Sequence, residues 1–262
     1  MVVLRDDLRL ALDRVAFARS LGVEPDSWQE RLLRSGSDRV LLNCCRQSGK
    51  STMSALIALH RALYHPGSLV LCLAPALRQS QELFAKVSGY YRQLENPARA
   101  DADRKLSLEL ENGSRIVTLP GTEKTIRGFS GASLLIVDEA ARVEDELYFA
   151  VRPMLAVSGG GLLMLSTPYG QRGVFYEAWT TGQGWERYTV TAEECPRISP
   201  EFLAEERLAL PERVYRQEYE CSFEAVEGAV FDISDWRESA VDLPAPFSAQ
   251  ELAGFSNLQQ GW

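Results

Sequence analysis

The chain has 262 residues, 45% of them hydrophobic, and a formal net charge of −8 at pH 7. This length and apolar content allow a large buried core in one large domain or two small ones. No stretch approaches the ~20 consecutive apolar residues of a membrane span, and the charged N-terminus is not built as a signal peptide. The acidic balance argues against a dedicated high-affinity nucleic-acid binder, without excluding a local basic patch.

The cysteines give no sign of a disulfide framework. Their number is five, and Cys44, Cys45 and Cys72 fall in apparent core strands, where a thiol behaves as a small hydrophobe. Cys195 and Cys221 are far apart in sequence, and the chain has two histidines, so no zinc-site spacing is present. We therefore expect Cys44, Cys45 and Cys72 to be small buried side chains outside any disulfide framework.

Helical patterns begin the chain. Leu4 to Ser20 has the spacing of one amphipathic helix that stops near Gly22, and Pro25-Asp26-Ser27 is typical of a new helix start. We expect residues 1–26 to form a helical extension ahead of the main domain.

The next element is an apolar strand that leads into a Gly-Lys-Ser sequence. Val40 to Cys45 has the pattern of a buried strand, and Ser51 to Tyr64 that of a helix with one apolar face. A strand, a glycine-containing turn and a helix in this order wrap backbone N–H groups around the phosphates of a nucleotide. The common pattern has a further glycine at the position of Cys44, so the motif alone leaves open a surface turn ahead of a helix.

Strands and helices alternate through the middle of the chain. Leu69 to Ala74 is a short apolar run, Leu77 to Leu94 has helical spacing, and a hairpin is expected around Glu111-Asn112-Gly113-Ser114. After the apolar run Ser133 to Val137, a helix is expected near Glu144 to Met154. A glycine-rich turn then precedes a strand from Leu162 to Leu165. This alternation predicts a mostly parallel sheet flanked by helices.

Two adjacent carboxylates, Asp138 and Glu139, follow the strand Ser133 to Val137. Such a pair can cap a following helix, because acidic groups favour its N-terminus. With Lys50 and Ser51 upstream, a more specific function is indicated. Asp138 would hold Mg²⁺, and Glu139 would orient or deprotonate the water that attacks the γ-phosphate. The sequence therefore predicts hydrolysis of ATP with Mg²⁺.

Four motifs in order resemble the ATPase half of the large terminase subunit, the motor that packages DNA into tailed-bacteriophage and herpesvirus-type capsids. They are Arg46-Gln47-Ser48-Gly49-Lys50-Ser51-Thr52, Ile126-Arg127-Gly128, Ile136-Val137-Asp138-Glu139-Ala140-Ala141 and Leu165-Ser166-Thr167-Pro168-Tyr169-Gly170. The resemblance covers about Trp28 to Phe231. It implies a RecA-like, additional-strand P-loop ATPase, and we expect this domain to span residues 27–231.

The resemblance also implies a role for individual residues. Lys50 would contact the β- and γ-phosphates, and Ser51 would help to hold Mg²⁺. Arg46 matches the arginine that terminases place in the phosphate loop, Gln47 to Thr52 would complete the nucleotide-binding loop, and Glu139 would activate water. Ser166-Thr167-Pro168 resembles the coupling motif that senses the γ-phosphate. Trp28-Gln29 looks like the adenine-reading glutamine with its aromatic neighbour, the alternative being a glutamine on a helix surface.

Two departures from the family pattern stand out. Some terminases have an arginine just before the coupling strand that reaches into a neighbouring subunit, whereas this chain has Ser158-Gly159-Gly160-Gly161 there. Arg142 and Arg152 are the nearest substitutes, and either can instead be a surface or structural arginine. The family's nuclease domain is not expected here, because the residues from 232 to 262 are too few for it, and we expect a tail or linker stub without nuclease activity.

The partners implied by the resemblance are double-stranded DNA, a portal ring, a small terminase subunit and further copies of this chain, in the cytoplasm of a bacterial host. No membrane partner is expected. Two alternatives stay open: a superfamily 2 helicase-like ATPase, and a prophage remnant that binds nucleotide or a capsid partner without hydrolysis. The helicase needs a second nucleotide-binding lobe of ~150 residues, for which little of the chain remains after Leu165.

Overall fold

A computed structural model describes residues 2–94, 100–104, 106–120 and 128–225, and the fold below is that of the unit Met1–Glu224. Within these residues the centre is an eight-stranded sheet of order β3-β4-β5-β2-β6-β7-β1-β8. The strands are β1 (Arg39–Cys44), β2 (Leu69–Ala74), β3 (Ala100–Arg104), β4 (Ser107–Leu110), β5 (Arg115–Pro120), β6 (Leu134–Asp138), β7 (Gly161–Ser166) and β8 (Glu186–Val190). Strand β4 runs antiparallel to β3 and β5, and the other pairs are parallel, as predicted.

The central strands are apolar along their whole length because both faces of the sheet are covered. In β2, for example, Leu71 and Leu73 point into one hydrophobic core, whereas Val70 and Cys72 point into the other. Successive side chains of a strand face opposite sides, so one apolar run serves two cores.

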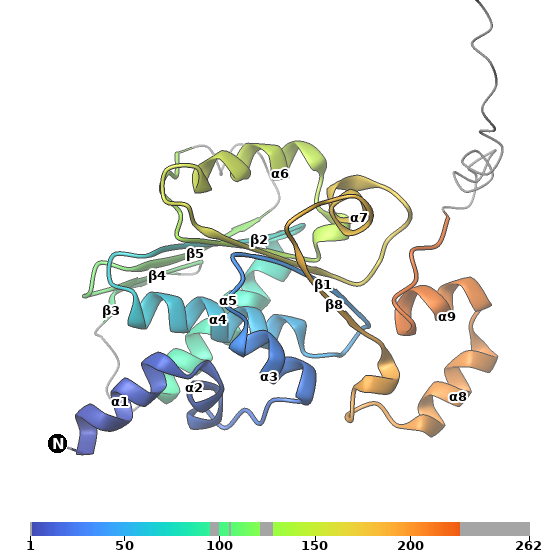
Figure 1. Ribbon diagram of the computed structural model, residues 1–262, viewed down its shortest axis with the longest axis horizontal. Coiled ribbons are helices and arrows are strands. Elements are labelled where there is room, and N and C mark those ends of the chain that lie inside the picture. Colours follow the sequence, from blue (N-terminus) through green and yellow to red (C-terminus); the bar gives the residue numbers. More distant parts are fainter. Residues whose placement is uncertain (1, 95–99, 105, 121–127, 226–262) are drawn as a thin grey trace, which may run out of the picture. The chain divides into compact units, whose positions relative to one another are not determined.

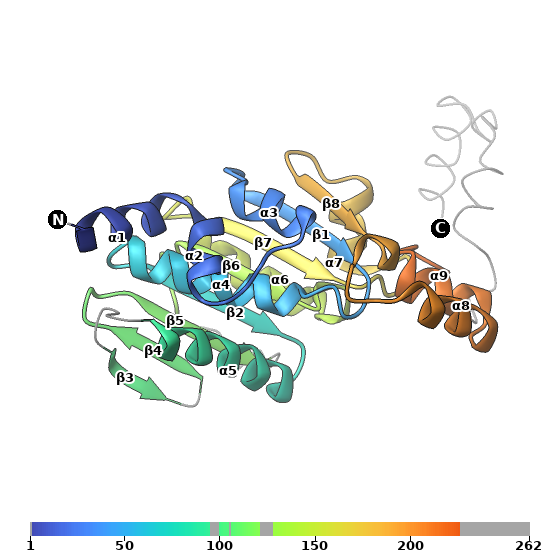
Figure 2. The same ribbon diagram turned by 90° about the horizontal axis from the view of Figure 1, so that it is seen from below.

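Helices cover the two faces unequally, as Figures 1 and 2 show: α1 to α5 lie on one face, and α6 and α7 lie on the other. The helices are α1 (Val2–Leu12), α2 (Arg14–Ser20), α3 (Ser27–Arg34), α4 (Lys50–Tyr64), α5 (Leu77–Gln93), α6 (Asp145–Val151), α7 (Gly173–Thr180), α8 (Pro200–Ala209) and α9 (Glu212–Tyr219). Short 3₁₀ turns are η2 (Ala140–Arg142), η3 (Arg152–Leu155) and η4 (Ala192–Glu194). Among the described residues, no helix has the length and apolar character needed to cross a membrane.

The N-terminal segment differs from the prediction of one helix over Leu4 to Ser20. Asp13 leaves the helical conformation, and its Oδ1 accepts hydrogen bonds from the N–H groups of Val15 and Ala16 at 2.9 and 3.1 Å. An aspartate in this position caps a new helix, so the segment becomes α1 and α2. Phe17 of α2 packs in the same core as the sheet.

The helix predicted near Glu144 to Met154 is also shorter than expected. Helix α6 covers Asp145–Val151, and the chain then continues as the tighter 3₁₀ turn η3, which contains Pro153. Proline lacks the N–H that would continue the α-helical pattern. Elements β3, α7, β8, α8 and α9 were not predicted from the sequence, and the predicted tail, 232–262, lies outside the described residues. The domain boundaries at 26 and 231 stay predictions.

The topology places three strand ends side by side. Strand β7 lies between β6 and β1 and is parallel to both, with Asp138 paired to Leu165 and Asn43 paired to Ser166. Parallel neighbours end at the same edge of the sheet. The segments that follow Cys44, Asp138 and Ser166 therefore meet there, and these are the segments that carry the predicted motifs. Strand β8 pairs with β1 on the side opposite to β7, next to the loop that follows Cys44.

Candidate nucleotide-binding site

The loop between β1 and α4 turns twice into the left-handed region. The Cys45 N–H still donates to the Val190 carbonyl of β8 at 2.9 Å, after which Gln47 has φ 62° and Gly49 has φ 95°. Helix α4 then begins at Lys50. In the described part of the chain, the N–H groups of Ser48, Gly49, Lys50 and Ser51 donate no hydrogen bond. A row of free backbone N–H groups at a helix start is an anion-binding arrangement.

Lys50 reaches back across this loop. Its side chain is buried, and Nζ donates to the Cys45 carbonyl and to Thr167 Oγ1, each at 3.0 Å. The segment that resembles the coupling motif therefore contacts the loop lysine through Thr167. The ammonium group is held by neutral oxygens, so its positive charge is available to an incoming phosphate.

The acidic pair lies beside the start of α4. Ser51 Oγ donates to Asp138 Oδ2 at 3.1 Å. Burial, reinforced by the neighbouring charge of Glu139, raises the pKa of Asp138 to about 6, although Lys50 and the Ser51 hydroxyl oppose the shift. A hydroxyl and a carboxylate side by side fit Mg²⁺, which is held in proteins by few side chains together with water and substrate phosphates. In the described residues, no group of three or more His, Cys, Asp or Glu forms a closed metal site.

Glu139 occupies a strained position for a residue with a side chain. Its φ is 51°, and its N–H donates to Asp138 Oδ1 at 3.0 Å, so the chain turns sharply at the end of β6. Strain of this kind is found where the surroundings fix a side chain for a function. The Arg142 guanidinium lies 4.0 Å from Glu139 Oε2 and 4.4 Å from the centre of the Tyr169 ring. Arg142 thus links the acidic pair to the segment after the coupling motif, within the same chain.

Arg46 points elsewhere. Its Nε donates to Glu218 of α9, and its N–H donates to the Glu218 carbonyl at 3.2 Å. The Arg46 side chain is 63% exposed. The predicted catalytic contact of Arg46 with phosphate therefore requires that it leave Glu218.

Trp28 and Gln29, the predicted adenine-reading pair, lie in different surroundings. Trp28 is 1% exposed and packs in the hydrophobic core, with its Nε1 buried and unpaired. Gln29 is also buried, and Nε2 donates to the Ser48 carbonyl at 3.3 Å while Oε1 accepts from the Asp26 N–H at 3.0 Å. Gln29 is thus not a helix-surface glutamine. It touches the phosphate loop, and its contact with adenine stays a prediction.

The site cavity has a volume of about 580 Å³. Its wall includes the loop, Glu139, Arg142 and Thr167, and also three polar residues of α5 that the sequence analysis missed: Gln79, Glu82 and Lys86. A further missed residue is Arg197, whose NH2 donates to the Ser48 carbonyl at 2.8 Å. No local pattern marks Arg197, because it lies 149 positions after Ser48 in the sequence.

The other predicted residues are placed less centrally. Ser166 Oγ donates to the Thr167 carbonyl at 2.7 Å, and Pro168 is buried. Arg152 is exposed at the start of η3, near the N-terminal ends of the strands. It is therefore away from the loop edge, by which we mean the edge of the sheet where β1, β6 and β7 end. Ile126 and Arg127 lie outside the described residues. The five cysteines are free and buried, and burial was expected for Cys44, Cys45 and Cys72. The fold brings Cys45 Sγ within 3.7 Å of Cys195 Sγ.

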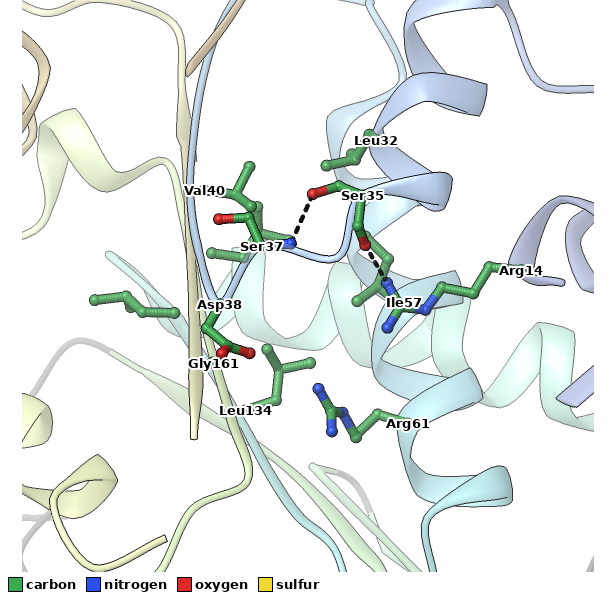
Figure 3. Close-up of a pocket in the computed structure, with 12 residues that line it drawn as sticks. Arg14, Leu32, Ser35, Ser37, Asp38, Val40, Ile57, Arg61, Leu134 and Gly161 are labelled. Carbon is green, nitrogen blue, oxygen red and sulfur yellow. Dashed lines mark hydrogen bonds between the residues drawn. The ribbon is translucent and has the colours of Figure 1, made fainter. Parts of the chain in front are cut away.

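A second cavity lies at the opposite edge of the sheet, where β1 and β7 begin. Figure 3 shows the guanidinium groups of Arg14 and Arg61 pointing toward it, beside Asp38 and Leu134. Its volume is about 40 Å³, close to that of a single water molecule and far too small for a nucleotide. The loop edge is therefore the candidate site.

A parallel sheet with a strand, a phosphate loop, a buried lysine and an acidic pair at neighbouring strand ends defines a P-loop nucleotide-binding protein. The family described as terminase large subunit, T4likevirus-type, N-terminal, matches residues 41–238, and the chain belongs to this family.

Individual relatives agree with this assignment. The chain is 28% identical over 252 residues to the large terminase subunit of Thermus virus P23-45, covering 82% of this chain and 52% of the relative. It is 24% identical over 234 residues to that of Escherichia phage T5, covering 85% and 53%. The chain thus spans about half the length of the curated relatives it matches.

Solved structures show the same fold. The large terminase ATPase domain of Thermus phage P74-26 superimposes with a TM-score of 0.71 at 26% identity, over 79% of this chain and 97% of that one. The large terminase of bacteriophage D6E in complex with ADP gives a TM-score of 0.64 at 12% identity, over 76% and 53%. The predicted fold, RecA-like with a mostly parallel sheet flanked by helices, is confirmed.

Proposed function

We propose that this chain hydrolyses Mg·ATP and that hydrolysis powers the translocation of double-stranded viral DNA into a procapsid. The observation that carries the proposal is the convergence of Lys50 on Thr167 and of Ser51 on Asp138, beside four loop N–H groups that donate no hydrogen bond to the described residues. Membership of the large terminase family supports the choice of DNA packaging over other uses of ATP.

In the proposed reaction, the loop N–H groups and Lys50 bind the phosphates. Mg²⁺, held at Ser51 and Asp138, would neutralise phosphate charge. Glu139 orients the attacking water and accepts its proton, while Lys50 and Arg46 offset the negative charge that develops on the transferred phosphoryl group. Thr167 shares a hydrogen bond with Lys50, so departure of the γ-phosphate changes the partners of the coupling motif.

The proposed partners are double-stranded DNA, a portal protein, a small terminase subunit and further copies of this chain, in the cytoplasm of a bacterial host. Arg142 already lies beside Glu139 in its own chain, and Arg152 is exposed at the far edge of the sheet. Which of them acts on a neighbouring subunit stays a prediction. To test this, Arg142→Ala or Arg152→Ala protein is mixed with Glu139→Gln protein. Restored ATPase activity in one of the mixtures identifies the arginine that acts on the neighbouring subunit.

The direct test is phosphate release from Mg·ATP by the purified chain, followed by protection of double-stranded DNA from nuclease in portal-bearing procapsids with the small subunit. Lys50→Ala is the control that removes nucleotide binding. Hydrolysis with no DNA protection would contradict the packaging function and leave the ATPase intact. ADP binding with no phosphate release would contradict hydrolysis and favour a non-hydrolysing binding module.

A further inference from the structure

The outer side of the phosphate loop is held by two side chains that converge on one carbonyl. The Ser48 carbonyl accepts from Gln29 Nε2 at 3.3 Å and from Arg197 NH2 at 2.8 Å. Arg197 follows η4, whereas Gln29 belongs to α3, so two distant segments meet at one peptide group of the loop.

The orientation of that peptide group decides where the next N–H points. The peptide between Ser48 and Gly49 is trans, since the described chain has no cis peptide bond. In a trans peptide the C=O and the N–H point in opposite directions. Holding the Ser48 carbonyl outward therefore aims the Gly49 N–H to the inner side of the loop, where phosphates are expected.

Arg197 is itself held in place. Its NH1 lies 2.8 Å from Asp26 Oδ2, and the Asp26 side chain is 13% exposed. The guanidinium thus has one nitrogen for the carboxylate and another for the carbonyl, a planar fork that a lysine cannot reproduce. Asp26 also donates its N–H to Gln29 Oε1, so Asp26, Gln29, Arg197 and Ser48 form a closed ring of contacts.

The two donors also lie close to the backbone of Gly49. At Gly49, φ is +95°, and an added Cβ would lie 2.7 Å from Gln29 Nε2 and 3.5 Å from Arg197 NH2. Both donors therefore pack directly against the turn that they hold.

We propose that Arg197 is a positioning residue for nucleotide binding: by fixing the Ser48 carbonyl outward, it aims the Gly49 N–H at a phosphate group. This inference rests on the proposed function for its ligand. It predicts an effect on phosphate affinity, with little effect on the chemical step or on recognition of the base.

The test compares Arg197→Ala, Arg197→Lys and the double variant Asp26→Asn/Arg197→Ala with the wild type. Arg207→Ala is the matched control, because Arg207 is an exposed arginine paired with Glu220 and is not in the wall of the site cavity. The measurements are the Kd of ADP, the affinity of adenosine by competition with ADP, the KM and kcat for ATP, and the midpoint of thermal unfolding.

We expect Arg197→Ala to weaken ADP binding and raise the KM for ATP by roughly tenfold, the usual size of one charge-assisted hydrogen bond. The value of kcat at saturating ATP and the affinity of adenosine should stay within about twofold. Arg197→Lys should not restore the affinity, since it keeps the charge and loses the fork. The unfolding midpoint should match that of Arg207→Ala.

Three results would overturn the inference. One is ADP affinity within about twofold of the wild type. Another is an equal loss for ADP and adenosine, which would indicate a base contact. The third is recovery of affinity in the double variant, which would mean that Arg197 only neutralises Asp26. A wild-type chain that binds ADP without releasing phosphate contradicts the proposed function while leaving this test valid.

Discussion

The two edges of the sheet carry similar kinds of side chain but arrange them differently. At the loop edge, Lys50, Asp138 and Arg197 each contact a fixed polar partner. At the opposite edge, the Arg14 side chain makes one long hydrogen bond, 3.4 Å to the Ser35 carbonyl, and the Arg61 side chain forms no ion pair or hydrogen bond with the described part of the chain. Burial, with the nearby charge of Arg61, lowers the pKa of Arg14.

The difference shows that charged groups in a cavity do not by themselves make a functional site. At the loop edge, the backbone is bent into the left-handed region at Gln47, Gly49 and Glu139, and each bend presents a polar group to one cavity of about 580 Å³. At the other edge, the cavity that Arg14 and Arg61 line has a volume of about 40 Å³. Convergence of fixed donors, and not charge alone, distinguishes the nucleotide site.

The largest effect is expected for Glu139→Gln at the loop edge. The amide keeps the shape of the side chain but cannot accept the proton of the attacking water, so kcat should fall by about 10² to 10⁴ while ATP affinity changes little. Single-turnover phosphate release and nucleotide affinity, measured on the same protein, check this. Turnover near the wild-type rate would show that Glu139 does not activate the attacking water.

Lys50→Ala serves as the contrasting variant. It removes a charge that binds phosphate in both the ground state and the transition state, so nucleotide affinity itself should fall. If Lys50→Ala and Glu139→Gln gave the same pattern of kcat and affinity, the separate roles of the two residues would be wrong.

A second prediction concerns two glycine-to-alanine substitutions, one at each edge of the sheet. At Gly160, just before β7, an added Cβ would lie 2.1 Å from the Ala132 carbonyl oxygen, so Gly160→Ala should cost about 2–4 kcal/mol of unfolding free energy. Surviving folded protein should bind ADP normally. Gly49→Ala should do the reverse, with a smaller loss of stability and a large loss of ADP affinity, because its Cβ meets the Gln29 side chain and its φ is +95°.

Chemical denaturation and ADP titration measure the stability and the ADP affinity of both variants. A Gly160→Ala protein that unfolds at the wild-type denaturant concentration would show that the backbone there moves freely. A Gly49→Ala protein with unchanged ADP affinity would show that the left-handed turn is not needed for phosphate binding.

The segments that meet at the loop edge could be recognised in the sequence because their signals are local. The strand before Gly49, the acidic pair after β6 and the hydroxyl groups after β7 are each contiguous in the chain, and the parallel sheet brings them together. Arg197 and Glu218 could not be found this way, since nothing near them in sequence indicates that they fold against the loop. The break at Asp13 was missed because the apolar spacing continues through it while the capping hydrogen bonds do not show in that spacing.

A third, smaller effect concerns the charge of Asp138. Its pKa in the folded chain is raised from 3.8 to about 6, mainly by burial. The folded state then holds a proton that the unfolded state has released, so this group favours folding below pH ~4 and the contribution is lost as pH rises to about 6. Without Mg²⁺, Asp138→Asn should therefore become more stable relative to the wild type as pH rises through this window.

Unfolding midpoints of the two proteins in chelator, at several pH values from 4.5 to 7.5, measure the difference. A constant difference between wild type and Asp138→Asn over this range would mean that Asp138 keeps its ordinary pKa. Arg61→Gln should not become more stable relative to the wild type as pH rises, because Arg61 lies at the opposite edge, where burial and the charge of Arg61 lower the pKa of His65.

The smallest effect is expected for Arg61→Gln itself. Arg61 lies near the partly buried guanidinium of Arg14, and like charges repel, so its removal should change the unfolding free energy by less than about 0.5 kcal/mol, in the stabilising direction. The gain should shrink as salt is raised, since salt screens exposed charges. Nucleotide affinity and kcat should equal those of the wild type. A clear loss of stability at low salt would show that Arg61 has an attractive partner at this edge, and the contrast between the two edges would then be weaker than the structure indicates.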